Sequence, residues 1–393
     1  MMYSKPLKVL SIFGTRPEAL KMVSVIKELE LRKEVDSIIC VTEQHKEMLR
    51  QVLDIFDIHP DYNLNIMKNN QNINGLTTKI LKKIKEILRE AKPDIVLTHG
   101  DTTTTLAASL ASFYEKIPVC HVEAGLRTYN NHAPWPEEVN RRVTDIVSDV
   151  FFAPTQQSRH NLLKEGVCDT KILVTGNTII DTLFLALKKI KENKETLSQI
   201  GETFPFLDPT KRLILVTGHR RENFGDGIKN LCNALLTIAN RDDVQIVFPV
   251  HLNPNVHKPV KKMLSSKKNI FLIDVQPYLP FVYLMDRSYF IITDSGGIQE
   301  EAPSLGKPVL VTRSVTERPE AVESGTVQLV SNCSEKICEA TYALLNNQEL
   351  YNHMSCQKNP YGEGTAARQI ADYIITLSQR EEERKNVWST EYV

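Results

Sequence analysis

The sequence carries no net charge, since 48 lysines and arginines balance 48 aspartates and glutamates over 393 residues. No overall field therefore attracts nucleic acid or an anionic membrane surface, and any basic site must be local. The seven cysteines include no C-x-x-C pair, so the sequence offers neither a disulfide framework nor a cysteine-based zinc site. These absences predict a cytoplasmic protein without a bound metal, a nucleic-acid partner or a membrane partner.

The N-terminal part lacks a long apolar run. The run at residues 9–13 is broken by Gly14, Arg16 and Pro17, so we interpret it as a first strand and not as a signal peptide or membrane span. No G-x-x-x-x-G-K-S/T loop occurs, which excludes the usual ATP-hydrolysing site. The segment GEGTAA at residues 362–367 matches G-x-G-x-x-A, but it follows KNPY instead of a strand. The sequence therefore predicts no NAD site and no other cofactor.

Short β-branched runs alternate along the chain with segments of helical spacing, such as the apolar stripe within residues 80–91. The expected strands lie at 7–13, 37–41, 94–98, 118–122, 150–153 and 172–175, and then at 213–217, 244–250, 270–274, 290–294 and 308–311. This alternation predicts parallel sheets covered on both faces by helices. The fold class is α/β, with two Rossmann-like doubly wound domains and a central cleft.

The boundary between the two series of strands lies in a polar stretch at residues 188–212, which has no strand signals. We place a first domain at residues 1–187 and a second at residues 188–365. Residues 366–393 are expected to form a C-terminal helix and tail that pack back on the first domain.

Ligands of such sheets bind beyond the carboxyl ends of the strands, so functional residues are expected in the segments that follow each strand. The first strand is followed by GTRPEALK, where Gly14 allows a tight turn and Pro17 suits the first position of a helix. Arg16 and Lys21 bracket that helix start. The motif is typical either of a phosphate site or of a helix start with two solvated cations.

Three carboxylates follow other strands of the first series. They are Asp101 in HGDTTTT, Glu123 in HVEAGLRT and Glu137 in PWPEE. Taken singly, Asp101 could be a helix N-cap, and a glutamate at a helix start is favoured by the helix dipole. Because the exits of parallel strands converge on one rim, three carboxylates there suit proton transfer.

The second series offers groups suited to an anion. TGHRREN places His219 beside two arginines, which suits an anion better than the alternative of a solvated basic loop. In DSGG, Ser295, Gly296 and Gly297 lie between a strand and a helix, where exposed N–H groups can receive a diphosphate. Glu301 lies about one helical turn further on, where a carboxylate can accept hydrogen bonds from a ribose diol.

Several motifs together resemble the non-hydrolysing UDP-N-acetylglucosamine 2-epimerases of bacteria, in order from residue 7 to residue 375. These motifs are FGTRPEALK, HGDTTTT, HVEAGLRT, PWPEEVNRR, TGNTIIDTL, TGHRREN, DSGGIQEEAPSLGKPVLV and TERPEAVESGT. The resemblance implies a glycosyltransferase-B-like fold, a nucleotide sugar bound between the two domains, and a homodimer.

The resemblance also implies roles for individual residues. Asp101, Glu123 and Glu137 match the catalytic carboxylates of the family, and His219 joins them at the active site. The residues expected to bind the UDP-N-acetyl sugar are Arg16, Lys21, Gln276, Phe281, Ser295, Gly296, Gly297, Glu301 and Arg318. Some relatives bind a second, activating nucleotide sugar; this chain keeps Gln44 and His45 but has Glu47 and Asn70 where those relatives have a glutamine and an arginine.

The expected reaction is inversion of C2 in UDP-N-acetylglucosamine to give UDP-N-acetylmannosamine. No carbonyl acidifies the C2 hydrogen, and no nicotinamide site is predicted, which favours elimination of UDP to 2-acetamidoglucal followed by re-addition. The alternatives are a hydrolysing epimerase that releases UDP and N-acetylmannosamine, an epimerase of a related UDP-2-acetamido sugar, a glycosyltransferase that needs an acceptor, and a binding protein without turnover.

Overall fold

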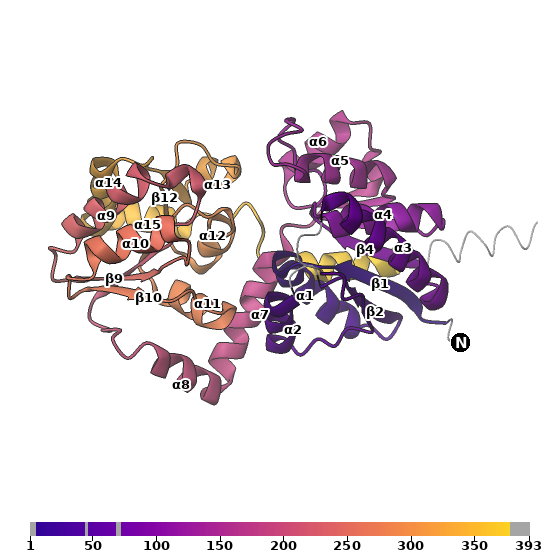
Figure 1. Ribbon diagram of the computed structural model, residues 1–393, viewed down its shortest axis with the longest axis horizontal. Coiled ribbons are helices and arrows are strands. Elements are labelled where there is room, and N and C mark those ends of the chain that lie inside the picture. The colour runs from indigo at the N-terminus through magenta and orange to yellow at the C-terminus, as the bar shows by residue number, and fades with distance from the viewer. Residues whose placement is uncertain (1–4, 44–45, 68–71, 378–393) are drawn as a thin grey trace, which may run out of the picture. The chain divides into compact units, whose positions relative to one another are not determined.

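The structure is a computed structural model that describes residues 5–43, 46–67 and 72–377 (Figure 1). Gln44, His45, Asn70 and the tail from residue 378 onward therefore lie outside the described residues. The chain divides into two compact units. The first unit contains the residues up to Thr182 and those from Tyr361 onward, and the second runs from Leu183 to Pro360.

Both crossings between the units lie before the expected domain boundaries. The chain crosses after Thr182 and after Pro360, whereas we expected 187 and 365, a difference of five residues each time (187 − 182 and 365 − 360). The reason at the first crossing is that helix α7 (Thr178–Glu192) runs through it, so the helical spacing gives no sign of a boundary.

The C-terminal residues 366–377 are helical. Asp181 accepts hydrogen bonds from the backbone N–H groups of Ala366 and Ala367 at 3.3 and 3.0 Å.

The first unit is built on a seven-stranded sheet in the order β3-β2-β1-β4-β5-β6-β7, and its strands pair in parallel. Its strands are β1 (Leu7–Phe13), β2 (Val35–Val41), β3 (Tyr62–Asn63), β4 (Ile95–His99), β5 (Val119–Val122), β6 (Val150–Ala153) and β7 (Ile172–Val174). Its helices are α1 (Arg16–Glu30), α2 (Lys46–Ile55), α3 (Ile73–Ala91), α4 (Thr103–Tyr114), α5 (Glu137–Val147), α6 (Gln156–Lys164), the 3-10 turn η1 (Asp169–Lys171) and the start of α7.

The second unit is built on a six-stranded parallel sheet in the order β10-β9-β8-β11-β12-β13. Its strands are β8 (Arg212–Val216), β9 (Val244–Pro249), β10 (Ile270–Ile273), β11 (Phe290–Thr293), β12 (Val309–Val311) and β13 (Val327–Leu329). Its helices are α8 (Lys194–Thr203), η2 (Arg221–Asn223), α9 (Asp226–Ile238), α10 (Pro254–Leu264), α11 (Tyr278–Arg287), α12 (Gly296–Glu301), η3 (Ala302–Leu305), α13 (Pro319–Glu323), α14 (Ser334–Asn346) and α15 (Gln348–Cys356).

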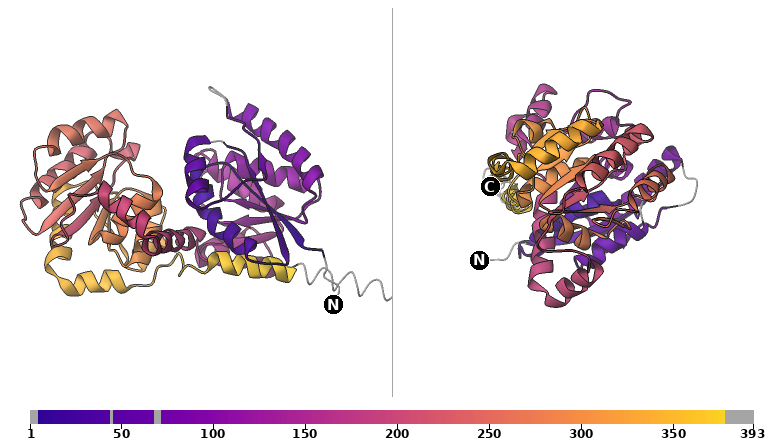
Figure 2. Two further views of the ribbon diagram at one scale, coloured as in Figure 1. Left: turned by 90° about the horizontal axis from the view of Figure 1, so that it is seen from below. Right: turned by 90° about the vertical axis from the view of Figure 1, so that its left-hand side faces the viewer.

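The predicted fold class is confirmed, because each unit is a parallel sheet with helices on both faces (Figure 2). All eleven expected strands are present, with bounds that differ by at most two residues. The sequence reading missed β3 and β13, which are edge strands of two and three residues. Strands this short at a sheet edge bury little apolar surface and so leave no periodic signal.

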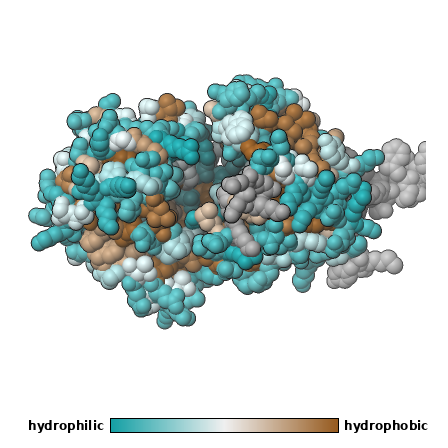
Figure 3. Space-filling model, viewed as in Figure 1, coloured by the Kyte–Doolittle hydropathy of each residue, from teal (hydrophilic) through white to brown (hydrophobic). Residues whose placement is uncertain are grey.

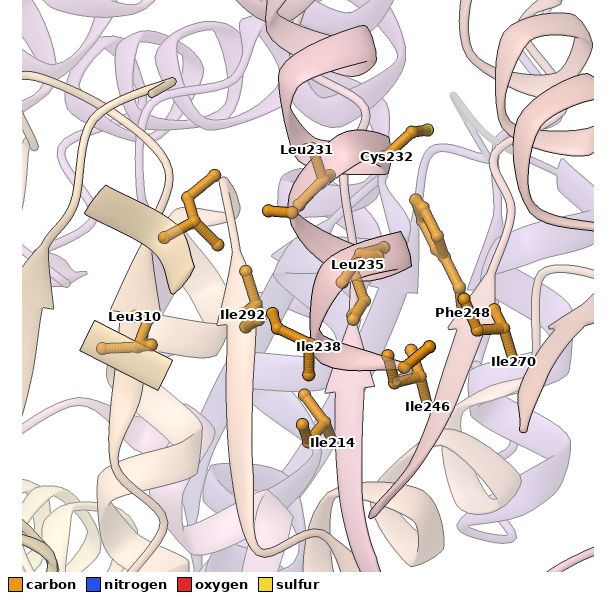
Figure 4. Close-up of a cluster of buried hydrophobic side chains, with 14 of the residues drawn as sticks. Ile214, Leu231, Cys232, Leu235, Ile238, Ile246, Phe248, Ile270, Ile292 and Leu310 are labelled. Atoms are coloured by element: carbon orange, nitrogen blue, oxygen red, sulfur yellow. The ribbon is translucent and has the colours of Figure 1, made fainter. Parts of the chain in front are cut away.

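Each sheet has a core of strand side chains packed under amphipathic helices. Figure 4 shows the core of the second unit, where Ile214, Ile246 and Ile292 from three neighbouring strands meet Leu235 and Ile238 of α9; all five are fully buried. Strands covered on both faces read as nearly continuous apolar runs, which is why they were recognisable in the sequence. Among the described residues, no helix combines the length and apolar character needed to cross a membrane.

Candidate active site

The turn after β1 is held by a buried carboxylate that the sequence reading did not single out. Glu18, at 2% exposure, accepts hydrogen bonds from the N–H groups of Gly14 and Thr15 at 3.1 and 2.8 Å. Its other oxygen accepts from the hydroxyls of Thr102 and Thr105 at the start of α4. Burial raises the pKa of Glu18, and these hydrogen bonds oppose the rise. Glu18 therefore joins the ends of β1 and β4; its sequence signal was the capping box T-x-x-E.

The glycine of this turn is required by close packing. A Cβ at Gly14 would lie 2.0 Å from the hydroxyl of Thr42 and 2.6 Å from that of Thr104, so only glycine fits. Arg16 is the first residue of α1 and is partly exposed. Lys21, one turn further along α1, forms an ion pair with Glu123.

Asp101 lies directly after the turn that ends β4, and its carboxylate is 2.8 Å from the guanidinium of Arg141 in α5. Its side chain is 28% exposed. Burial raises the pKa of Asp101; Arg141 and Lys21 lower it, while Glu123 and Glu137 raise it. The charges of the two other predicted carboxylates therefore both act on Asp101.

The alternative interpretation of Asp101 as a helix cap is wrong. The N-cap of α4 is Thr102, whose hydroxyl accepts a hydrogen bond from the N–H of Thr105 at 3.2 Å.

The two adjacent glutamates at the start of α5, Glu137 and Glu138, lie in different environments. Glu138 is fully buried and accepts from two backbone N–H groups of the preceding loop, whereas Glu137 is partly exposed at the first position of α5.

Glu123 follows β5 in a left-handed backbone conformation, with φ of 65°. Such a conformation is uncommon for a residue with a side chain and is concentrated at functional sites. In addition to the ion pair with Lys21, its carboxylate accepts a hydrogen bond from the amide of Asn177 at 2.9 Å. The Nε2 atom of His99, the last residue of β4, lies 3.8 Å from the same oxygen.

A buried polar pair supports the turn that carries Asp101. His121 in β5 contacts Asp145 at 2.6 Å through Nδ1 and the carbonyl of Gly100 at 2.7 Å through Nε2. Burial raises the pKa of Asp145, but His121 and Arg127 lower it more, so the pKa lies below its usual value. Gly100 has φ of 69°, which a glycine adopts without strain.

In the second unit, Asp294 organises the turn after β8. It is fully buried, and its Oδ2 accepts from the backbone N–H of His219 at 3.0 Å, the N–H of Arg220 at 2.9 Å and the amide of Asn223 at 3.0 Å. The ring of His219 is 44% exposed, with Nδ1 3.4 Å from Asp294. Burial is the main cause that lowers the pKa of His219, so the ring is neutral at pH 7. Asp294 was overlooked because the sequence shows only a strand that ends in an aspartate.

Two guanidinium groups lie beside the start of α12. A Cβ at Gly296 would be 3.6 Å from Nη2 of Arg220 and 3.9 Å from the guanidinium of Arg318. Arg318 is held by an ion pair at 2.5 Å with Glu300, which is 2% exposed. Glu300 therefore turns away from its neighbour Glu301, as consecutive helical residues do.

Glu301 lies next to α11, because its carboxylate accepts a hydrogen bond from the hydroxyl of Tyr278 at 3.0 Å. Tyr278 belongs to the same short stretch as Gln276 and Phe281, the residues expected at uracil. Among the described residues, no hydrogen bond links Arg16, Gln276 or Phe281 to another predicted site residue. The first unit thus carries the carboxylates, and the second carries His219, the Ser295–Gly297 turn, Arg318 and Glu301.

A family model described as UDP-N-acetylglucosamine 2-epimerase matches residues 27–375. Enzymes named UDP-N-acetylglucosamine 2-epimerase from Neisseria meningitidis and Campylobacter jejuni are 53% and 54% identical to this chain over 370 and 373 residues. Each alignment covers 94% of this chain, with 99% of the Neisseria enzyme and 97% of the Campylobacter enzyme.

Solved structures agree with the sequence comparison. The Neisseria meningitidis enzyme bound to UDP-GlcNAc superposes with a TM-score of 0.86 at 52% identity, covering 94% of this chain and 100% of that one. The Methanocaldococcus jannaschii enzyme in complex with UDP-GlcNAc and UDP gives a TM-score of 0.76 at 35% identity, with the same coverage. The chain therefore belongs to the UDP-N-acetylglucosamine 2-epimerase family.

Proposed function

We propose that this protein interconverts UDP-N-acetylglucosamine and UDP-N-acetylmannosamine by eliminating UDP and adding it back. A base removes the C2 proton while the C1–O bond breaks, which gives 2-acetamidoglucal and UDP. Protonation of C2 from the other face, with return of UDP to C1, gives the epimer. One proton leaves and one returns, so the step balances without an oxidant. The product is of the kind used in cell-surface polysaccharide synthesis.

The coupled carboxylates are the observation that carries this proposal. Asp101 follows β4, Glu123 follows β5 and Glu137 begins α5, and the charges of Glu123 and Glu137 both raise the pKa of Asp101. A raised pKa brings a carboxyl group closer to the operating pH, where it both takes and gives a proton efficiently. Asp101 and Glu137 act on the C2 proton, and Glu123 orients the sugar or tunes the other two.

The remaining site residues bind UDP. The support is local: guanidinium groups of Arg220 and Arg318 lie beside Gly296, and cations placed there stabilise the departing diphosphate. The residues assigned to the diphosphate are Arg16, Lys21, His219, Ser295, Gly296, Gly297 and Arg318. Glu301 binds the ribose, and Gln276 and Phe281 bind the uracil.

Solvent isotope incorporation tests the reaction. In D₂O, the wild type is expected to place deuterium at C2 of both epimers, because the C2 proton is lost and regained at each turnover. The measurement is proton NMR of UDP-N-acetylglucosamine incubated with the purified protein. Epimerisation without deuterium at C2 would exclude elimination, and free N-acetylmannosamine as the main product would show a hydrolysing enzyme instead.

Glu301→Ala is expected to raise the Kd for UDP about tenfold or more. The substitution removes charge-assisted hydrogen bonds to the ribose, each worth about 1.5–3 kcal/mol. Isothermal titration with UDP measures the effect. Tyr278→Phe is the matched control, because it removes only the hydroxyl that contacts Glu301 and leaves the carboxylate in place. Equal UDP affinity in wild type and Glu301→Ala would remove Glu301 from the nucleotide site.

A cytoplasmic homodimer is the assembly we propose. All seven cysteines are free thiols, as expected in a reducing compartment. Large apolar side chains are exposed on α4 and α5, which pack against each other: Phe113 and Tyr114 at 54% and 63%, and Ile146 at 79%. Figure 3 shows apolar side chains on the part of the first unit that carries α5 and α6. Such patches mark association surfaces.

The test of this assembly is Ile146→Lys. The substitution places a charge on the apolar surface of α4 and α5 and is expected to convert the dimer to a monomer. Sedimentation velocity measures the change. Lys164→Ala, on α6, is the control that leaves the apolar side chains in place. A wild type that sediments as a monomer would contradict the proposal.

A further inference from the structure

His99 is a buried histidine whose polar atoms are not used by the fold. It is the last residue of β4 and is 3% exposed. Both ring nitrogens are buried, and neither has a hydrogen-bond partner among the described residues. Burial lowers its pKa to about 3, so the ring is neutral and carries one N–H donor. A buried donor without an acceptor is costly, and native proteins rarely retain one without a reason.

The carboxylate of Glu123 is the acceptor within reach. Its Oε2 lies 3.8 Å from Nε2 of His99, which is too long for a hydrogen bond but short enough to be closed by a side-chain rotation. In this structure the carboxylate is occupied by Lys21 and by the amide of Asn177. Lys21 is also one of the cations that the proposed function assigns to the diphosphate. Its ammonium group can therefore pair either with Glu123 or with the diphosphate.

The geometry points to an exchange of partners at Glu123: a bound diphosphate draws Lys21 away, and the neutral ring of His99 then donates its N–H to the carboxylate. This inference rests on the proposed function. His99 is a positioning residue, because it acts through Glu123. The exchange keeps the carboxylate oriented while it replaces a cation by a neutral donor. A carboxylate beside a neutral donor is a stronger base than one beside an ammonium group.

Two charged groups near His99 and Glu123 are paired with other residues. Asp101 is paired with Arg141, and His121 is bonded to Asp145 and the carbonyl of Gly100. None of these pairs has to break for His99 to reach Glu123.

An NMR experiment tests the exchange without requiring turnover. The histidine ring N–H signals of the isotope-labelled full chain are recorded with and without saturating UDP, and His99→Gln assigns the signal of His99. The signal is expected to move downfield when UDP binds. In Lys21→Met, which has no ammonium to compete, it is expected in the downfield position already without UDP. A His99 signal at the same position with and without UDP would overturn the inference.

Kinetics provide the second arm. His99→Leu removes the donor and is expected to lower kcat about tenfold with little change in KM, whereas His99→Gln, which keeps an N–H near Nε2, retains most of the activity. Ser11→Ala is the control, since it removes another buried, unpartnered polar atom from the neighbouring strand β1. Equal losses in the Leu and Gln variants would indicate a structural role and overturn the inference. A wild type that does not epimerise would refute the proposed function, and the NMR result would still decide the exchange.

Discussion

Asp101→Asn is expected to lower kcat by about 10² to 10⁴, the usual contribution of general acid–base catalysis. The amide has nearly the size of the carboxylate and can still contact Arg141, but it cannot accept or return the C2 proton, which is the role we propose for Asp101. The carboxylate is also the one whose pKa is raised by burial and by two neighbouring carboxylates. Initial rates of epimerisation, followed by NMR or by a coupled assay, measure the loss.

The fold of this variant is expected to survive, because Thr102 and not Asp101 caps α4.

The raised pKa of Asp101 also determines how the free energy of unfolding changes with pH. The folded protein holds the Asp101 proton more tightly than the unfolded chain does, so ionisation destabilises the fold. The free energy of unfolding of the wild type, relative to Asp101→Asn, should therefore fall as the pH rises above the ordinary value of 3.8. Urea unfolding at several pH values measures this difference.

The matched control is Asp149→Asn, which changes an aspartate whose carboxylate accepts from the N–H of Val119, at the start of β5. That position is remote from the carboxyl ends of the strands, so wild-type kcat is expected. If Asp101→Asn also kept wild-type kcat, Asp101 would have no part in proton transfer.

The sequence was sufficient for the fold and for the types of residue at the strand ends. Strands such as β1 and β6 were located to the residue, because a strand buried on both faces is a continuous apolar run between polar turns. Once the strands are known, the rule that parallel strands share one carboxyl edge brings Asp101 and Glu123 together without any coordinates.

The sequence could not identify the groups that hold these residues in place. Glu18 joins the ends of two strands through residues 84 and 87 positions away, and such pairings follow only from the three-dimensional packing. The sequence pattern locates the start of α4 only to within a few residues. It could therefore not decide whether Asp101 or Thr102 caps that helix. His99 was part of a recognised motif, but its burial and its distance from Glu123 are properties of the folded chain.

The largest effect expected in the second unit comes from Asp294→Ala. The substitution leaves the N–H groups of His219 and Arg220 and the amide of Asn223 without their buried acceptor. Without that acceptor the turn loses its fixed position. A hydrogen bond to a charged group is worth about 1.5–3 kcal/mol, so loss of one such bond between the turn and bound UDP raises the Kd for UDP by about 10- to 150-fold. Turnover should fall as well, because the turn no longer holds His219, which we propose binds the leaving diphosphate.

Isothermal titration with UDP and initial-rate measurements test this prediction, with thermal unfolding to confirm that the variant is folded. Asp294→Asn provides a milder change, since its remaining oxygen still accepts hydrogen bonds from the turn, and its effect should lie between wild type and alanine. Asp208→Ala is the matched control in the same unit, because that aspartate also accepts from a backbone N–H, that of Thr210, but does so at an exposed turn. Wild-type affinity for UDP in a folded Asp294→Ala protein would show that the position of the turn after β8 does not matter for nucleotide binding, and His219 would then have to be removed from the diphosphate site.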